Sequence, residues 1–337
     1  MIKVGLIGAG KMGISHLSIL GAHQDVEVVG VCDTSKMVMD VLKKYTAFPC
    51  YTDYQDMLGQ SQPDAVFVAV PTKYHAGMVK KILEDGRHVF VEKPLCLTPA
   101  DGEQLVNLAT KNNLINQVGY HNKFIGTFRE VKKIVDAGFL GEIFHFTGES
   151  YGPVVTQRKQ NNWRSNPEEG GGCLMDYASH VIDLINYILG PVVKVHGSVL
   201  KSLYSKNVED AVYSLLELEN KISGVLSVNW SDETYRKMTT SITIDGSKGK
   251  IISDANELKV YFKTDDCPPG YSRGWNIKNV TELTECVDFY LRGEEYSAQV
   301  DYFIRSVQNK GMNAINDFKS AWNTDRAISL IRESANN

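Results

Sequence analysis

The sequence predicts an α/β domain with a doubly wound parallel sheet, followed by an α+β domain with an open, mainly antiparallel sheet. The first observation is a short apolar strand at residues 2–7 that leads into a glycine-rich loop and a helix. The second is the alternation of apolar strands and helices up to Asn122, which is typical of parallel sheets with right-handed crossovers. The third is the period-two alternation of apolar and polar residues from Val192 onward, which indicates antiparallel strands joined by short turns.

The first domain is expected over residues 1–122. Thr98 before Pro99 is a typical N-cap arrangement and predicts a helix through Lys111. Ligands of doubly wound sheets bind outside the carboxyl ends of the strands, so side chains at these ends are candidate contacts. The predicted strands are 2–7, 26–32, 64–70, 88–92 and 115–120, and the other predicted helices begin near Lys11 and span 35–45, 54–58 and 75–85.

The second domain is expected over residues 123–312, and residues 313–337 are expected to form a C-terminal helix that packs back on the first domain. A polar loop at 152–172 precedes a series of strands that are expected to pair as antiparallel meanders. The clearest predicted strands are 141–151, 208–218, 222–230, 238–245 and 258–263, and the predicted helices are 124–137, 296–309 and 320–333.

The glycine-rich loop at residues 8–13 fits the pattern G-x-G-x-x-G and predicts a dinucleotide site. Gly8 allows a tight turn, Gly10 lets the backbone approach a pyrophosphate, and Gly13 lets the helix pack against the strand. The pyrophosphate would lie on the free N–H groups at the start of this helix. The alternative is a glycine turn in a flavodoxin-like domain that binds no nucleotide.

An acidic residue ends the second predicted strand. Asp33 lies twenty residues after Gly13, where a carboxylate can accept hydrogen bonds from the adenosine ribose hydroxyls. This carboxylate suits a ribose diol and repels a 2′-phosphate, so NAD is the expected cofactor, with NADP as the alternative because Lys36 lies close by. Lys11 and Met12 of the glycine loop are further expected cofactor contacts.

The ends of the later strands supply more candidate contacts. Lys93, in the segment Glu92-Lys93-Pro94, could touch both the nicotinamide ribose and a substrate hydroxyl. Burial or neighbouring cations would lower its pKa and let it exchange protons. The alternative is a surface lysine that merely follows a strand. The expected cofactor contacts at these strand ends are Val70, Pro71, Thr72, His75, Glu92, Lys93 and His121.

A second strong signal is the run from Gly170 to Asp183. Its three glycines permit a close, left-handed backbone, and a helix is expected to begin near Leu174. Asp176 and His180 are four residues apart and therefore share one helical face, with Asp183 one turn further on. Histidine titrates near neutral pH, so His180 could take a hydroxyl proton as hydride leaves the same carbon, while Asp176 steadies its charge or orients the substrate. The alternative is a solvent-facing Asp–His pair; no metal is expected, because the run lacks an HExxH pattern.

These motifs together resemble the glucose–fructose oxidoreductase, inositol dehydrogenase and rhizopine-catabolism (Gfo/Idh/MocA) family over nearly the whole chain. The residues that carry the resemblance are the glycine loop at 8–13, Glu92-Lys93-Pro94, Trp163-Arg164 and residues 170–183. The resemblance implies a Rossmann domain, an open-sheet second domain, and hydride transfer between NAD(P) and a secondary alcohol of a sugar, cyclitol or nucleotide-sugar.

The resemblance also implies roles for individual residues. Lys93 matches the family's catalytic lysine, Asp176 its substrate-orienting carboxylate and His180 its acid/base, and Arg164 matches a position that often reaches the cofactor or substrate. The chain departs from the family at His121 and Lys123, where many relatives carry Asn or Met and Arg, respectively. This departure bears on the substrate and leaves the predicted fold unchanged.

Two other functions stay open at this point. A hydrolase of the same fold would use bound NAD transiently to cleave a glycoside, and a non-catalytic sensor would bind NAD or a sugar. In the loop at 157–164, Arg158 or Lys159 could hold a phosphate of a phosphorylated or nucleotide-linked substrate, or could simply be solvated charges.

Composition narrows the function classes. A formal net charge of −4 gives no general attraction to nucleic acid or to an anionic membrane surface. The six cysteines are scattered without zinc-ligand spacing and are expected to be reduced thiols in the cytoplasm. No signal peptide is expected, because the N-terminal apolar run is short, and no stretch approaches the ~18 apolar residues of a membrane helix.

A homodimer or homotetramer is expected from the strand at 222–230. Leu226, Val228 and Trp230 share one face of this strand. If the chain's own helices leave that face uncovered, it would be an apolar subunit contact. The alternative is that the helices beginning near Phe124 and Tyr296 bury it.

Overall fold

The computed structural model describes residues 1–157, 163–288, 290–291, 293–309, 311 and 315–336. The chain divides into two compact units. One comprises Met1–His121 and Val287–Trp322, and the other comprises Asn122–Cys286 and the residues from Asn323 on. The three-part domain division expected from the sequence stays a prediction.

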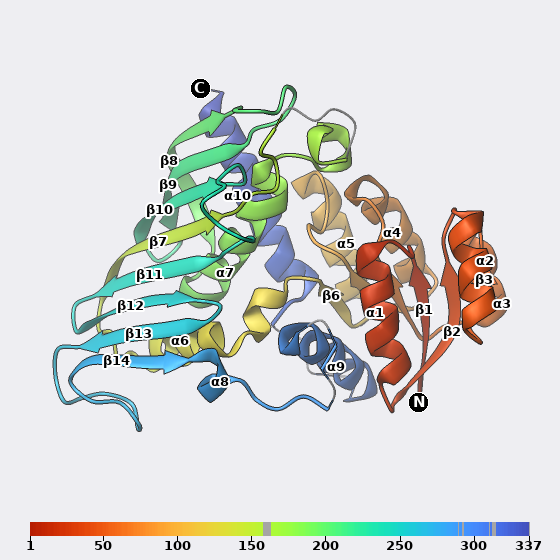
Figure 1. Ribbon diagram of the computed structural model, residues 1–337, viewed down its shortest axis with the longest axis horizontal. Helices are drawn as coiled ribbons and strands as arrows, with labels where there is room; N and C mark the ends of the chain where they lie inside the picture. The colour runs from red at the N-terminus through yellow and green to blue at the C-terminus, as the bar shows by residue number, and fades with distance from the viewer. Residues whose placement is uncertain (158–162, 289, 292, 310, 312–314, 337) are drawn as a thin grey trace. The chain divides into compact units, whose positions relative to one another are not determined.

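The first unit is built on a six-stranded sheet in the order β3-β2-β1-β4-β5-β6, in which every pair of neighbours is parallel (Figure 1). The strand order reverses between β1 and β4, and such a switch point is where doubly wound sheets bind their ligands. The predicted doubly wound parallel sheet is confirmed. The strands are β1 Ile2–Ile7, β2 Val26–Cys32, β3 Cys50–Tyr51, β4 Ala65–Val68, β5 His88–Val91 and β6 Asn116–Val118.

Helices cover both faces of this sheet. One core cluster joins α3, α4, α5 and the first turn of α10 to side chains such as Val66 and Val89. The other joins α1, α2 and α9 to Val4, Phe67 and Phe90 on the opposite face. These strands are apolar on both faces because both faces are buried. The helices are α1 Lys11–Ala22, α2 Lys36–Tyr45, α3 Tyr54–Ser61, α4 His75–Glu84, α5 Pro99–Lys111, α9 Glu294–Asn309 and α10 Phe318–Ala335.

Local signals in the sequence set several boundaries. The Thr98 side chain accepts a hydrogen bond from the Asp101 backbone N–H at 3.2 Å, so the expected N-cap of α5 is confirmed. The last two predicted strands of this sheet are shorter than expected, and the chain turns soon after β6. Tyr120 N–H donates to Val118 O in a tight turn rather than to a neighbouring strand. The two-residue strand β3 was not predicted.

The second unit holds an eight-stranded sheet in the order β14-β13-β12-β11-β7-β10-β9-β8. All neighbours are antiparallel except β7 and β10, which pair in parallel. The sheet is mainly antiparallel, as predicted. The parallel pair β7–β10 joins the strand before the loop at 152–172 to one of the later strands, because a long connection with its own helix lets the chain return in the same direction. The strands are β7 Ile143–Tyr151, β8 Val192–Lys201, β9 Ala211–Leu218, β10 Ser223–Asn229, β11 Ser241–Gly246, β12 Gly249–Asp254, β13 Glu257–Phe262 and β14 Gly274–Asn279.

Helices of the second unit cover one face of its sheet. These are α6 Gly126–Asp136, α7 Ser179–Leu189, the π-helical turn Leu174–Ala178 before α7, and the short α8 Val280–Leu283. A Cβ on Gly148 of β7 would lie 2.7 Å from Val181 of α7, so helix and sheet are in close contact there. Leu226, Val228 and Trp230 are completely buried on this covered face. The expectation that they form an exposed patch is therefore wrong.

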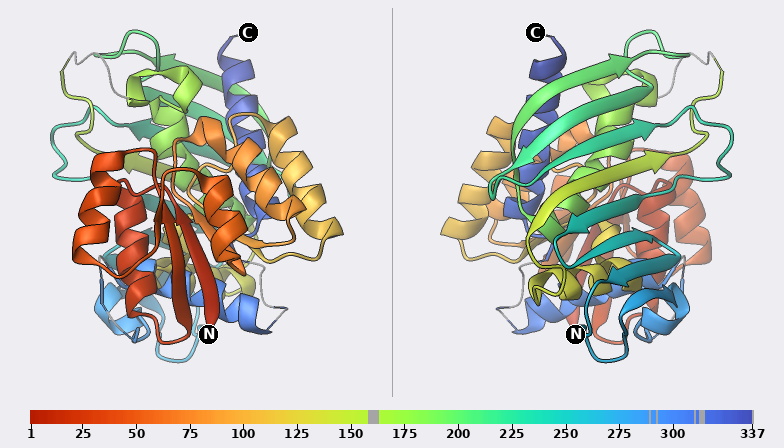
Figure 2. Two further views of the ribbon diagram at one scale, coloured as in Figure 1. Left: turned by 90° about the vertical axis from the view of Figure 1, so that its right-hand side faces the viewer. Right: turned by 90° about the vertical axis from the view of Figure 1, so that its left-hand side faces the viewer.

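In the right-hand view of Figure 2, no described helix of the second unit lies over the opposite face of this sheet. Leu215, Val225 and Ile252 are 45%, 37% and 38% exposed on this face. Cross-strand pairing aligns them in one row with Thr147 and Thr243. The exposed apolar surface is therefore on the side of β10 opposite to the one expected.

Among the described residues, none of the helices combines the length and the apolar character needed to cross a bilayer.

Candidate nucleotide and substrate site

The glycine loop has the shape that its sequence predicts. Gly8 has φ +94°, and a Cβ there would lie 2.4 Å from the Ala69 carbonyl oxygen. A Cβ on Gly13 would lie 1.8 Å from the Gly8 carbonyl oxygen, so both positions exclude a side chain. Gly10 meets nothing within 4 Å, and the first turn of α1, which holds Lys11 and Met12, contains no acidic residue. The loop thus leaves open space at a positive helix end, as a pyrophosphate requires.

Asp33 ties the end of β2 to this loop. Its Oδ2 accepts a hydrogen bond from the Ala9 N–H at 2.7 Å, and its Oδ1 accepts one from the Ser35 N–H at 2.8 Å. A carboxylate offers about four lone-pair sites, so two stay available for a ribose diol. The structure therefore brings the predicted ribose-binding residue next to the predicted pyrophosphate loop.

His75 contacts the backbone of the segment after β4. Each ring nitrogen of His75 lies 2.9 Å from a backbone carbonyl oxygen, Nε2 from that of Val70 and Nδ1 from that of Pro94. The side chain is completely buried, and this burial lowers its pKa. His75 therefore joins the Val70-Pro71-Thr72 segment to the residues after Lys93, and any influence on a cofactor would pass through these two loops.

Glu92 and Lys93 follow β5 at the same edge of the sheet. Glu92 Oε1 lies 2.6 Å from Nε2 of His16, and Glu92 Oε2 accepts a hydrogen bond from the Lys93 backbone N–H at 3.3 Å. His121, the last predicted contact of this unit, stacks on the ring of Tyr296 in α9 with 4.7 Å between centroids. Neither His16 nor the role of Tyr296 was predicted from the sequence. A histidine three residues after the glycine motif was the available signal for His16, whereas Tyr296 lies too far along the chain to give one.

In the second unit, packing requires two of the three glycines before the π-helical turn. A Cβ on Gly171 would lie 2.4 Å from the Arg164 carbonyl oxygen, and one on Gly172 (φ +106°) would lie 2.4 Å from Glu209 Oε1. Glu209 Oε1 also accepts a hydrogen bond from the Leu174 N–H at 2.9 Å. The close approach expected at these glycines is thus made to the Arg164 carbonyl and to Glu209, and no sequence signal had indicated Glu209.

The helix that follows places Asp176 and His180 where solvent hardly reaches them. They are 7% and 4% exposed, so the alternative of a solvent-facing Asp–His pair is wrong. The turn Leu174–Ala178 is π-helical, and insertions of this kind occur often at functional sites.

Arg164 contacts the predicted substrate-orienting carboxylate. Its Nε lies 2.9 Å from Asp176 Oδ2, and its guanidinium lies over the Trp163 ring, 4.5 Å from the centroid. This ion pair fixes the orientation of the carboxylate. Arg158 and Lys159, the candidate phosphate ligands of the same loop, lie outside the described residues.

Asp183, the third predicted residue of this run, forms an ion pair with Lys123. Its Oδ1 lies 2.8 Å from Nζ of Lys123, and the two side chains are 1% and 0% exposed. Burial raises the pKa of Asp183 to about 6, against the opposing charge and hydrogen bond of Lys123. Asp183 therefore anchors α7 and does not extend the Asp176–His180 pair. Within the described part of the chain, no group of three or more His, Cys, Asp and Glu side chains could hold a metal ion.

A parallel sheet with a glycine loop and a carboxylate at its switch point defines a dinucleotide-binding protein. The chain belongs to the Gfo/Idh/MocA family. Residues 2–120 match the family model described as "Oxidoreductase family, NAD-binding Rossmann fold", and residues 128–252 match the "GFO/IDH/MocA C-terminal domain". The resemblance seen in the sequence is confirmed, and the first unit contains an NAD-binding Rossmann domain.

Similar curated proteins include several sugar and cyclitol dehydrogenases. D-glucoside 3-dehydrogenase of Escherichia coli strain K12 is 32% identical over 199 residues, which cover 57% of this chain and 56% of that protein. Myo-inositol 2-dehydrogenase of Thermotoga maritima is 25% identical over 271 residues, 79% of each chain. The match thus spans little more than half the length of the first of these relatives.

Solved structures share the fold over the full chain. Levoglucosan dehydrogenase in complex with NADH has a TM-score of 0.89 at 20% identity and covers 99% of this chain and 97% of its own. The WlbA dehydrogenase from Bordetella pertussis, in complex with NADH and UDP-GlcNAcA, has a TM-score of 0.80 at 24% identity and covers 100% and 97%. At these identities the likeness shows the fold alone.

Proposed function

We propose that this protein is an NAD-dependent dehydrogenase that acts on a secondary alcohol of a sugar, cyclitol or nucleotide-sugar. The observation that carries the proposal is the burial of Asp176, on the glycine-led π-helical turn, and of His180, in the first turn of α7, in a chain that also has the dinucleotide loop. The activities of two relatives, a glucoside dehydrogenase and an inositol dehydrogenase, support the substrate class.

The chain's own residues would divide the work as follows. Gly8, Gly10 and Gly13 would admit the pyrophosphate, and Asp33 would accept hydrogen bonds from the adenosine ribose hydroxyls. NAD, when bound, would supply the hydride acceptor. The remaining cofactor contacts would come from Lys11, Met12, Val70, Pro71, Thr72, Lys93 and His121, with His75 and Glu92 holding these segments in place.

His180 would act as the general base in the direction of oxidation. As the C–H bond of the secondary alcohol breaks and its electron pair leaves as hydride, an imidazole nitrogen of His180 takes the hydroxyl proton and the C–O bond becomes a carbonyl. Asp176, oriented by Arg164, would hold a substrate hydroxyl, and Lys93 would bind the reacting oxygen. Reduction would run through the same groups in reverse.

The deciding experiment is a screen of sugars, cyclitols and nucleotide-sugars with NAD, read as net formation of NADH. Net NADH in proportion to the ketone product supports the proposal. Cleavage of a glycoside without net NADH would show the transient-oxidation hydrolase instead. Tight binding of NAD or sugar with no turnover of any compound in either direction would show a sensor.

We also propose that the protein works in the cytoplasm as a homodimer or homotetramer. The uncovered face of the second-unit sheet, with Leu215, Val225 and Ile252 in one row, supports this assembly. Exposed apolar surface of this kind marks subunit contacts, and closed symmetric pairing is its usual form.

A further inference from the structure

A buried histidine of the glycine-loop helix contacts the residue that precedes Lys93. His16 lies on α1, and its Nε2 is 2.6 Å from Oε1 of Glu92. The histidine is 0% exposed, and its ring packs against Phe67 and Phe90 in the core beneath the sheet. The helix that would hold the cofactor pyrophosphate is therefore joined directly to the end of β5.

Backbone contacts fix Glu92 as well. Its Oε2 accepts a hydrogen bond from the Lys93 N–H, and the Glu92 N–H donates to the Val68 carbonyl at 2.9 Å. Gly119, just beyond β6, leaves room for the carboxylate, because a Cβ there would lie 3.1 Å from Oε2. One oxygen of Glu92 thus contacts His16 and the other contacts the backbone of Lys93.

The contacts of Glu92 with His16 and with Lys93 depend on each other through the charge of the Glu92 carboxylate. Burial acts to raise the pKa of Glu92, but the hydrogen bond and charge of His16, together with the charge of Lys93, outweigh it and leave the pKa below its usual value. The ionised carboxylate is thus compensated from two sides. Loss of His16 would remove one side and leave a buried charge that must shift toward Lys93 or take up a proton.

We propose that His16 is a positioning residue for Lys93 and acts through Glu92. It fixes the lysine backbone relative to α1, so the group expected at the reacting oxygen and the helix expected at the pyrophosphate keep one alignment. The importance of this alignment rests on the function proposed above for Lys93. The contacts between His16, Glu92 and the Lys93 backbone are observed independently of that function.

Two substitutions separate the hydrogen bond from the packing. His16→Phe keeps an aromatic ring against Phe67 and Phe90 but cannot donate to Glu92. His16→Gln carries an N–H at about the reach of Nε2 and restores the donor. We expect kcat to fall about 10- to 100-fold in His16→Phe, the range for a reacting group displaced by about 1 Å, and to recover most of the way in His16→Gln. The affinity for NAD, measured by calorimetry, should fall less than kcat does in His16→Phe and should return toward the wild-type value in His16→Gln.

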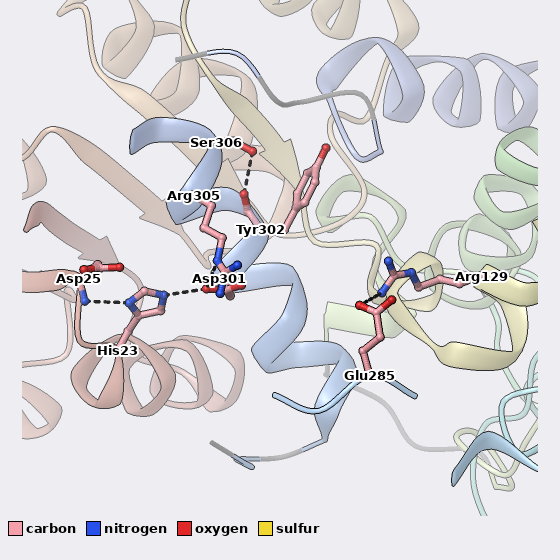
Figure 3. Close-up of polar contacts among 8 residues, drawn as sticks. All are labelled: His23, Asp25, Arg129, Glu285, Asp301, Tyr302, Arg305 and Ser306. Atoms are coloured by element: carbon pink, nitrogen blue, oxygen red, sulfur yellow. Dashed lines mark hydrogen bonds and ion pairs between the residues drawn. The ribbon is translucent and has the colours of Figure 1, made fainter. Parts of the chain in front are cut away.

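His23 supplies a matched control in the same unit. It follows α1, is 8% exposed, and its Nε2 lies 3.3 Å from Oδ1 of Asp301, which also binds Arg305 (Figure 3). His23→Phe breaks a second histidine–carboxylate pair, just after the end of the same helix, without touching Glu92. We expect it to lower the melting temperature and to leave kcat unchanged.

A second readout needs neither cofactor nor substrate. Trace acylation of the free protein, followed by mass spectrometry, measures the reactivity of the Lys93 amine against that of Lys36 as an internal reference. We expect the acylation rate of the Lys93 amine to change in His16→Phe, to be restored in His16→Gln and to be unchanged in His23→Phe. Equal Lys93 reactivity in all variants would overturn it, as would equal kcat. A wild-type protein without dehydrogenase activity, but with the expected acylation pattern, would overturn the proposed function alone.

Discussion

The ammonium group of Lys123 lies 2.8 Å from the Asp183 carboxylate, with both side chains enclosed in the second unit. Asp183 lies on α7 one turn after His180, so this pair helps to fix the helix that carries the proposed acid/base. Lys123 also lies 5.5 Å from the centroid of the Tyr187 ring on the same helix. The raised pKa of Asp183 shows that ion pairing does not fully offset the cost of burying the charge.

Replacing one residue of this pair should cost more stability than replacing both. Lys123→Met and Asp183→Leu should each lower the free energy of unfolding by about 3–5 kcal/mol, because each leaves an uncompensated buried charge. The double variant should be within about 1 kcal/mol of the wild type or more stable. Urea unfolding of the four proteins checks this. Additive losses in the double variant would show that the two side chains do not act as a pair.

His180 should be essential for turnover but not for cofactor binding. His180→Ala should lower kcat by about 10²–10⁴-fold, the usual contribution of a general acid/base, with nearly unchanged NAD affinity. Lys93→Ala should lower turnover as well and also weaken NAD binding, because the lysine is expected to touch both ligands. His196→Ala is the control, since that histidine pairs with Glu217 at an exposed position and should have no effect. A His180→Ala enzyme of near-normal rate would remove this histidine from the mechanism.

Asp33 should make NAD the preferred cofactor. Charge-assisted hydrogen bonds to a ribose diol are worth roughly 1.5–3 kcal/mol, so Asp33→Ala should weaken NAD binding by about one to two decades and narrow the preference over NADP. Because the Asp33 carboxylate also binds the N–H groups of Ala9 and Ser35, part of the loss would come from a looser loop. Asp33→Asn should keep one oxygen that can accept a backbone N–H. It therefore separates the loss of hydrogen bonds to the ribose from the loosening of the loop. Titration of both cofactors into the three proteins measures this, and equal or tighter NADP binding by the wild type would contradict it.

Local sequence signals predicted the parts of the site that depend on neighbours in the chain. Gly8, Gly13 and Gly172 are required by contacts within short loops or by backbone conformation, and the motif spacing shows them. His16–Glu92 and Lys123–Asp183 join residues 76 and 60 positions apart, respectively, and no pattern in one sequence pairs them. The prediction of which face of the second sheet is exposed was wrong for another reason. Period two shows which residues of β10 share a face, but it is symmetric and does not show which face the helices cover.

The uncovered sheet face should hold the oligomer together. Leu215 and Val225 are directly paired across β9 and β10, so Leu215→Glu with Val225→Lys would place charges at one end of the exposed row, on the face opposite to the buried one. Light scattering at micromolar concentration should report a dimer or tetramer for the wild type and a 37.6 kDa monomer for the double variant. Val41→Lys, at an exposed position of α2, is the control and should leave the assembly intact. A wild-type protein that is already monomeric would show that this apolar face is simply solvated, and a double variant that stays oligomeric would place the subunit contact elsewhere.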